Sequence, residues 1–302
     1  MKRDAGLGKA GTLPVIHSRD LSRYDEVTMS QPQCIGVFDS GFGGLTVLKE
    51  LVASAPDARY LYFGDTARLP YGSKSAETVA RYAVSAVHFL EEHGAELMVI
   101  ACNTATALAL DQIIAAARVP VIGVVQPGAE RAASASKNRR VVVLATEATV
   151  SSHAYKKALE SRGVEAKEKA CPLLVPLVEE GWVEHPVTEE VAQIYLLEAF
   201  ADGFQSADVL VLGCTHYPLI KPLLRRVAPP HVAIVDSAES TAIVVARELE
   251  KNTPQPAASA SRIQPKPALK FFATDSVEKF HRLGAMFMGH AIDDVEHVDL
   301  KE

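Results

Sequence analysis

The stretch from residue 97 to residue 106 reads LMVIACNTAT. Its first four residues are apolar and two of them are β-branched, which predicts a buried strand. A thiol, an amide and a hydroxyl follow at Cys102, Asn103 and Thr104, before a run rich in alanine and leucine that predicts a helix. In open α/β sheets, ligands bind at the carboxyl ends of the strands, where loops and helix N-termini present free N–H groups. The stretch therefore predicts a polar site at the end of a parallel strand.

The same pattern recurs in the second half of the chain, where residues 208–218 read DVLVLGCTHYP. Cys214 follows Cys102 by 112 positions, and a second apolar strand end recurs at Leu144, 106 positions after Phe38. Similar offsets in the same order predict an α/β fold of two similar domains, each with a mainly parallel sheet flanked by helices. The domains are expected to be related by a pseudo-twofold, with the active site in the interdomain cleft.

Composition suggests where these domains begin and end. Residues 1–33 are polar and without periodicity, and are interpreted as an N-terminal extension. Residues 251–268 are rich in proline, alanine and serine, which is typical of a surface linker. The strand and helix that follow are expected to dock on the first half, since they bury too little surface alone. The first domain is therefore assigned to 34–127 plus 237–302, and the second to 128–236.

Apolar runs and helical periodicity predict the other elements. Residues 126–128, Gln-Pro-Gly, are expected to form a turn that closes a strand. One helix should contain both His153 and Tyr155. The other strands are expected at 34–38, 59–63, 119–125, 141–144, 232–235 and 271–274. The other helices are expected at 45–53, 75–91, 103–117 and 188–200, with a last helix after residue 274 that ends near 288.

The bulk composition excludes several classes of protein. Apolar residues make up 48% of the 302 residues, and no run of about 18 apolar residues could span a bilayer. The net charge of −6, with no basic cluster, argues against nucleic-acid binding and leaves a small molecule as the expected partner. No secretion signal is present at the N-terminus, so a cytoplasmic location is expected. Four cysteines without CxxC spacing argue against a zinc ribbon or a disulfide framework.

The pair of cysteines carries more information than either alone. A single buried cysteine is most often a small core residue, as is expected of Cys34 and Cys171. Cys102 and Cys214 instead both follow an apolar strand, both have a hydroxyl within two positions, and both precede a helical N-terminus that stabilises a thiolate. Two thiols on opposite sides of one carbon could remove and return a proton with inversion, without a cofactor. The pair predicts a stereoinversion enzyme.

Other chemistries fit these residues less well. After Gly41 and Gly43, a dinucleotide fingerprint would place its third glycine at position 46, which is Thr46. Cys214 and His216 could ligate a metal, but zinc needs three or four donors and no other Cys/His cluster is close in sequence. A cysteine–histidine hydrolase would leave the second thiol without a role.

Several polar residues near the strand ends have two readings. Asp39 could cap a helix or take part in catalysis, and Glu179 could lie in a solvated turn or tune a nearby thiol. His153 is interpreted as a surface or packing histidine. The neutral donors could form turns or bind carboxylate oxygens, and their positions after strands favour binding. These donors are Tyr71, Gly72, Asn103, Thr104 and Thr215.

Five motifs in this order resemble those of bacterial glutamate racemases, members of the cofactor-independent aspartate/glutamate racemase superfamily. The resemblance runs from about Ile35 to Leu300 and departs from the family only in the N-terminal extension and the insert near 254–267. The motifs are GVFDSGFGGL (36–45), YFGDTARLPYG (62–72), ACNTAT (101–106), VPLVEEG (175–181) and GCTHYP (213–218).

The resemblance implies a function and a set of roles. Cys102 would act on D-glutamate and Cys214 on L-glutamate, with Asp39 assisting Cys102, and His216 and Glu179 assisting Cys214. It also implies that no cofactor or metal is needed, that D-glutamate is supplied to peptidoglycan synthesis, and that the protein forms a homodimer with no nucleic-acid or membrane partner. The implied substrate-binding residues are Asp39, Ser40, Tyr71, Gly72, Asn103, Thr104, Thr215 and His216.

Three alternatives remain open at this point. An aspartate racemase would act on a substrate shorter by one methylene. A binding or regulatory protein would keep the fold without turnover, and a metal-dependent Cys/His hydrolase would contain bound metal.

Overall fold

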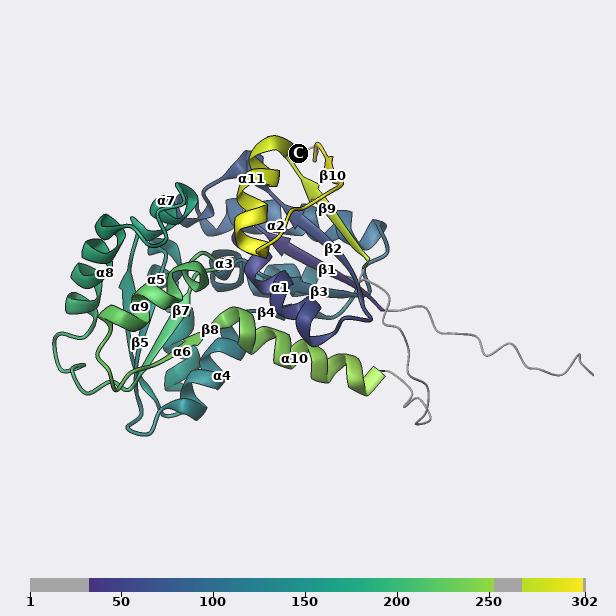
Figure 1. Ribbon diagram of the computed structural model, residues 1–302. Helices are drawn as coiled ribbons and strands as arrows, with labels where there is room; N and C mark the ends of the chain where they lie inside the picture. The colour runs from purple at the N-terminus through teal and green to yellow at the C-terminus, as the bar shows by residue number, and fades with distance from the viewer. Residues whose placement is uncertain (1–32, 253–267, 301–302) are drawn as a thin grey trace, which may run out of the picture. The chain divides into compact units, whose positions relative to one another are not determined.

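A computed structural model describes residues 33–252 and 268–300 of the chain (Figure 1). Two β-sheets form its framework, and helices pack against both. Every strand pairing in the two sheets is parallel. The predicted α/β class with two helix-flanked parallel sheets is confirmed. The predicted N-terminal extension, apart from Gln33, and the insert near 254–267 lie outside the described residues.

The larger sheet has six strands in the order β10-β9-β2-β1-β3-β4. All six residues of its central strand β1 are buried, as expected for a parallel strand covered on both faces. Strand β9 pairs along β2, so the C-terminal piece docks on the first half as predicted. The strands are β1 (Cys34–Asp39), β2 (Arg59–Gly64), β3 (Leu97–Ile100), β4 (Val121–Gly123), β9 (Leu269–Ala273) and β10 (Val295–His297).

The smaller sheet has four strands in the order β6-β5-β7-β8. They are β5 (Arg140–Ala145), β6 (Glu165–Ala170), β7 (Val209–Gly213) and β8 (Ala233–Asp236). The order β6-β5-β7-β8 repeats the order β2-β1-β3-β4 of the larger sheet, so β7 is the counterpart of β3. Cys102 and Cys214 therefore follow equivalent strands of two repeated sheets.

Eleven helices are found among the described residues. Helix α2 begins after Ser75, whose hydroxyl accepts a hydrogen bond from the Thr78 N–H, and it is followed by Gly94 at φ +91°. The helices are α1 (Leu45–Ser54), α2 (Ala76–Glu92), α3 (Asn103–Ala116), α4 (Val125–Ala135), α5 (Glu147–Ser152), α6 (Ala154–Glu160), α7 (Leu174–Glu179), α8 (Pro186–Ala199), α9 (Lys221–Val227), α10 (Ser237–Asn252) and α11 (Val277–Met288). Short 3₁₀ turns are η1 (Thr66–Arg68), η2 (Tyr71–Ser73) and η3 (Tyr217–Ile220).

Two local predictions were wrong, and two strands were not predicted. Residues 126–128 are not a turn but belong to the first turns of α4, where Pro127 needs no N–H partner. The helix predicted to contain His153 and Tyr155 is two short helices, because His153 itself adopts a left-handed conformation at φ 56°. The strand β6 was not predicted, and neither was β10. The division of the chain at 127/128 and 236/237 stays a prediction.

The two cysteines expected to be core residues lie in the core. Cys34 opens β1 and is 2% exposed, and Cys171, directly after β6, is fully buried in a core cluster. All four cysteines are free thiols. The remaining two lie at the carboxyl ends of β3 and β7.

Candidate active site

Cys102 is the residue that joins β3 to α3. It forms the N-cap of α3, where its sulfur accepts a hydrogen bond from the Ala105 N–H at 3.4 Å. The same sulfur lies 3.4 Å from the hydroxyl of Ser40, which follows β1. Cys102 is only 5% exposed. The strand end therefore presents a buried thiol that is held by a serine and a helix N-terminus.

Asp39 is the last residue of β1 and lies beside this thiol. Its Oδ2 accepts a hydrogen bond from the Gly41 N–H at 2.9 Å, but its buried Oδ1 has no partner among the described residues. Burial raises the pKa of Asp39, against the opposing effect of nearby backbone N–H groups and of His216. A buried carboxylate oxygen without a partner is costly, so a donor from a ligand would be well accommodated there.

The surroundings of Cys102 favour its neutral form. Burial raises the pKa of Cys102 to about 12, and the negative charge of Asp39 adds to this effect. The hydrogen bonds from Ser40 and from the Ala105 N–H act in the opposite direction but do not outweigh burial. Cys102 is therefore a thiol at neutral pH, able to give a proton.

Cys214 has different neighbours. Its sulfur lies 4.0 Å from Nδ1 of His216, whose Nε2 lies 3.1 Å from Oε1 of Glu179. Glu179 also pairs with Lys279 at 3.6 Å, and the His216 ring packs edge-on against Phe287. This is a Cys–His–Glu chain in which a protonated imidazole would stabilise a thiolate on Cys214 by charge attraction.

The protonated form of His216 is strongly favoured. Burial alone would lower the pKa of His216, but the hydrogen bonds and charges of Cys214 and Glu179 together raise it to about 10. The pKa of Glu179 is lowered although burial acts against this, because His216 and Lys279 stabilise the carboxylate. His216 therefore carries a positive charge at neutral pH.

The charge on His216 should make stability depend on pH. Because its folded pKa lies above the value of about 6.5 for an exposed histidine, the stabilisation is complete below pH 6.5 and is lost as the pH rises through 10. We expect the free-energy difference of unfolding between the wild type and His216→Gln to shrink by a few kcal/mol over this range. Urea unfolding at pH 6 to 10.5 measures it, and parallel pH profiles for the two proteins would contradict the assignment.

The two thiol-bearing regions touch through the loop after β1. A side-chain carbon added at Gly43 would lie 2.2 Å from Thr215 Oγ1 and 2.5 Å from His216 Nδ1, so the backbone approaches these residues closely. The hydroxyl of Thr46, in α1, lies 2.9 Å from the carbonyl oxygen of Thr215. This loop, which follows Asp39, therefore brings the surroundings of Cys102 against those of Cys214.

The predicted neutral donors lie at the same edge, but not all are free. The amide of Asn103 is held by the Tyr155 hydroxyl and by Ser237. The hydroxyl of Thr104 is 2.9 Å from that of Thr146. Thr104 also lies 3.3 Å from the Thr149 hydroxyl, which completes a small cluster of threonines. Asn103 and Thr104 are thus anchored by residues of the second half of the chain.

Tyr71 contributes differently from the sequence-based expectation. Its hydroxyl is buried and donates a 2.5 Å hydrogen bond to Asp65, so its single O–H donor is already used. Burial and the Asp65 charge raise the pKa of Tyr71, which keeps the hydroxyl protonated. Gly72 lies next to the side chain of Thr146. The backbone of this turn at Gly72 therefore lies beside the threonine cluster.

Four residues of this arrangement have no predicted role: Thr146, Thr149, Tyr155 and Ser237. Thr146 directly follows β5 and Ser237 directly follows β8, so the rule that ligands bind at strand ends could have found both. Tyr155 lies in α6 and carries no such signal.

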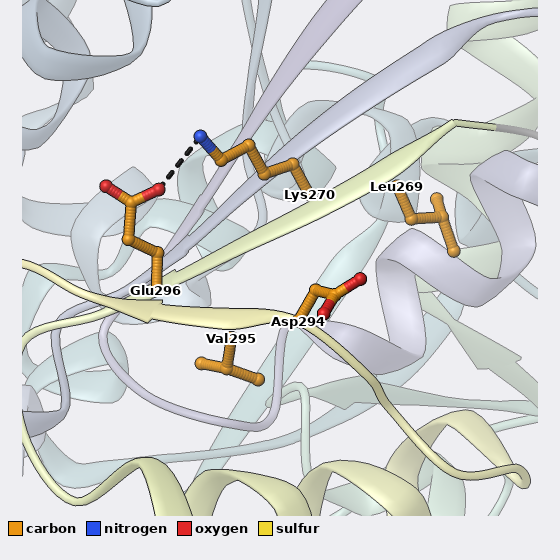
Figure 2. Close-up of a pocket in the computed structure, with 5 residues that line it drawn as sticks. All are labelled: Leu269, Lys270, Asp294, Val295 and Glu296. Carbon is orange, nitrogen blue, oxygen red and sulfur yellow. Dashed lines mark ion pairs between the residues drawn. The ribbon is translucent and has the colours of Figure 1, made fainter.

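One surface hollow lies away from these residues. It measures about 460 Å³ and is lined by Leu269, Lys270, Asp294, Val295 and Glu296 (Figure 2). Lys270 and Glu296 form an ion pair at 2.8 Å beside it. The hollow lies at the start of β9 and β10, whereas the thiols follow the ends of β3 and β7. We assign it no part in the site.

Within 33–252 and 268–300, no three His, Cys, Asp or Glu side chains come together as metal ligands. None of the helices in these ranges is both long and apolar enough to cross a bilayer.

A protein-family model described as Asp/Glu/hydantoin racemase matches residues 35–244. The chain belongs to this racemase family. It is 63% identical over 286 residues to the glutamate racemase of Koribacter versatilis, covering 89% of this chain and 98% of that protein. The family resemblance predicted from the five motifs is confirmed.

Solved structures of racemases agree with the fold. A glutamate racemase isoform of Bacillus anthracis superposes with a TM-score of 0.81 at 34% identity, covering 89% of this chain and 98% of the other. The glutamate racemase of Francisella tularensis in complex with D-glutamate gives a TM-score of 0.80 at 34% identity, covering 90% of this chain and 99% of the other.

The match to the racemase family model ends within α10, yet Lys279 and Phe287 of α11 contact Glu179 and His216. The last part of the chain therefore also contacts the candidate site.

Proposed function

We propose that this protein interconverts L-glutamate and D-glutamate by proton transfer at the α-carbon, with Cys102 and Cys214 as the two acid/base groups. One observation carries the proposal: the two thiols follow equivalent strands of two sheets with the same strand order. The 63% identical glutamate racemase supports glutamate as the substrate, as does the related structure in complex with D-glutamate.

The surroundings of the thiols suggest how the first turnover begins. Cys214, as a thiolate beside the charged His216, takes the α-proton of L-glutamate. The electron pair of the broken C–H bond remains on the α-carbon and its carboxylate. Cys102, a neutral thiol, gives its proton to the opposite face and becomes the thiolate. D-glutamate reacts by the same steps in reverse.

The polar residues hold the substrate in place. The unpartnered Oδ1 of Asp39 accepts from the substrate ammonium group, next to Ser40. Asn103, Thr104 and Thr215 donate to carboxylate oxygens, since all three are neutral and at most 5% exposed. Exclusion of water from these buried groups strengthens each interaction.

The test is an isotope-exchange assay on the purified protein. L-glutamate or D-glutamate is incubated in D₂O without pyridoxal phosphate, while circular dichroism and the α-proton NMR signal are followed. We expect the optical signal to decay to zero from either enantiomer, with deuterium entering the α-carbon. Absence of both changes would refute the proposal. Aspartate in the same assay distinguishes an aspartate racemase, and ligand-induced stabilisation without exchange would indicate a protein that only binds.

The wider setting is part of the same proposal. We assign the protein to the supply of D-glutamate for peptidoglycan, in the cytoplasm, as a homodimer with no cofactor. Analytical ultracentrifugation measures the oligomeric state in solution and so tests the dimer. We also keep the division into 34–127 plus 237–302 and 128–236, which limited proteolysis can test.

A further inference from the structure

We infer that Tyr155 is a positioning residue for this reaction, which fixes the Asn103 amide beside one thiol and braces the strand end that carries the other. The inference rests on the proposed glutamate racemase function. It follows from two contacts of the buried Tyr155 side chain, one with each half of the repeated fold, and from one further contact of Asn103.

The first contact fixes the orientation of an amide. Tyr155, in α6, is fully buried, and its hydroxyl donates to Oδ1 of Asn103 at 2.6 Å. Burial raises the pKa of Tyr155, so this hydroxyl stays protonated and can act as the donor. The oxygen of Asn103 is thereby assigned, and its NH₂ group must point the other way.

The second contact uses half of that NH₂ group. Nδ2 of Asn103 donates to the hydroxyl of Ser237 at 3.3 Å, and no described residue accepts its second N–H. Asn103 directly follows Cys102 and is 2% exposed, so a free N–H there is a buried donor next to the thiol. A donor in this place suits a carboxylate oxygen of the substrate, whereas a flipped amide would present an oxygen and repel it.

The third contact is made by the ring of Tyr155. A side-chain carbon added at Gly213 would lie 3.0 Å from Cε2 of the ring, and one added at Gly128 would lie 3.3 Å from Cε1. Gly213 is the last residue of β7 and directly precedes Cys214. The ring therefore packs against the backbone beside one thiol while its hydroxyl holds the residue beside the other.

The key experiment removes only the hydroxyl. In Tyr155→Phe the ring can keep its packing, but the Asn103 amide is free to rotate. We expect KM for both enantiomers to rise about 10-fold and kcat to change less than about threefold, because the amide binds ground state and transition state alike. In an Asn103→Ala background the same Tyr155→Phe change should have no further effect on KM, because the hydroxyl acts through the amide.

The matched control is Tyr60→Phe, which deletes another buried hydroxyl. The Tyr60 hydroxyl donates to backbone carbonyls near the end of α1, at 2.8 Å, and makes no contact with the site. We expect Tyr60→Phe to lower the thermal unfolding midpoint by about as much as Tyr155→Phe does, but to leave KM unchanged. A wild-type KM for Tyr155→Phe, or effects that simply add in the double variant, would overturn the inference.

A second variant keeps the test decisive if Tyr155→Phe folds poorly. Asn103→Asp retains an oxygen for the Tyr155 hydroxyl but replaces the N–H donor with a second oxygen. We expect KM to rise at least 10-fold, and an unchanged KM would overturn the inference. Failure of the proposed function is distinguishable, since in that case the wild-type protein would not racemise glutamate in the same assay.

Discussion

Replacing either Cys102 or Cys214 with alanine should abolish racemisation, with kcat falling at least about 10³-fold in both directions. Inversion needs one group to remove the α-proton and another on the opposite face to return it, so neither thiol can serve for both. Circular dichroism of each enantiomer measures the loss.

The two variants should differ in the exchange that remains. Cys102→Ala keeps the group assigned to L-glutamate and should still exchange the α-proton of L-glutamate with D₂O, whereas Cys214→Ala should exchange that of D-glutamate. Cys34→Ala is the control, since Cys34 is buried at the start of β1, away from the carboxyl ends of the strands. It should retain wild-type kcat. Full racemase activity in either Cys102→Ala or Cys214→Ala would refute the two-thiol mechanism.

Gly43→Ala should lower kcat at least about 100-fold. The new methyl carbon would lie 2.2 Å from Thr215 Oγ1 and 2.5 Å from His216 Nδ1, closer than any real contact of a Cβ atom. His216 must then move relative to Cys214 and Glu179, and the stabilisation of a thiolate depends on those distances. Steady-state kinetics with both enantiomers measures the effect, and urea unfolding shows whether folding is retained.

Gly41→Ala is a control in the same loop. Its added carbon meets the end of the Leu69 side chain at 2.7 Å, which can swing aside because Leu69 is only partly buried. We expect kcat within a few-fold of the wild type. A wild-type kcat for Gly43→Ala would mean that the contact between Gly43 and His216 is not kept during turnover.

The main elements of the fold were predictable because buried parallel strands are continuous apolar runs. Residues 97–100 and 209–213 show such runs, and both are strands. Strand β6 was missed because its sequence, EAKEKA, is charged and rich in helix-forming residues. It lies at the edge of its sheet, where pairing with β5 along its whole length outweighs local preference.

The site was predictable only where chemistry follows a strand directly. Asp39, Cys102 and Cys214 occupy such positions, so topology alone brings them to strand ends. The partner of His216 is Glu179, 37 positions away in α7, and that of Asn103 is Tyr155, 52 positions away in α6. Such pairs depend on how helices pack on the sheets, and no local sequence pattern indicates that packing.

The two thiols have unequal surroundings: a carboxylate and a serine beside Cys102, and a charged histidine beside Cys214. The enantiomers of glutamate have equal free energies in water, so their equilibrium constant is one. The ratio of kcat/KM for the two directions must therefore also equal one, however different the two sides of the site are. The asymmetry can make kcat and KM differ between the enantiomers, but only by the same factor. The enantiomer with the lower KM therefore has a kcat that is lower in the same proportion.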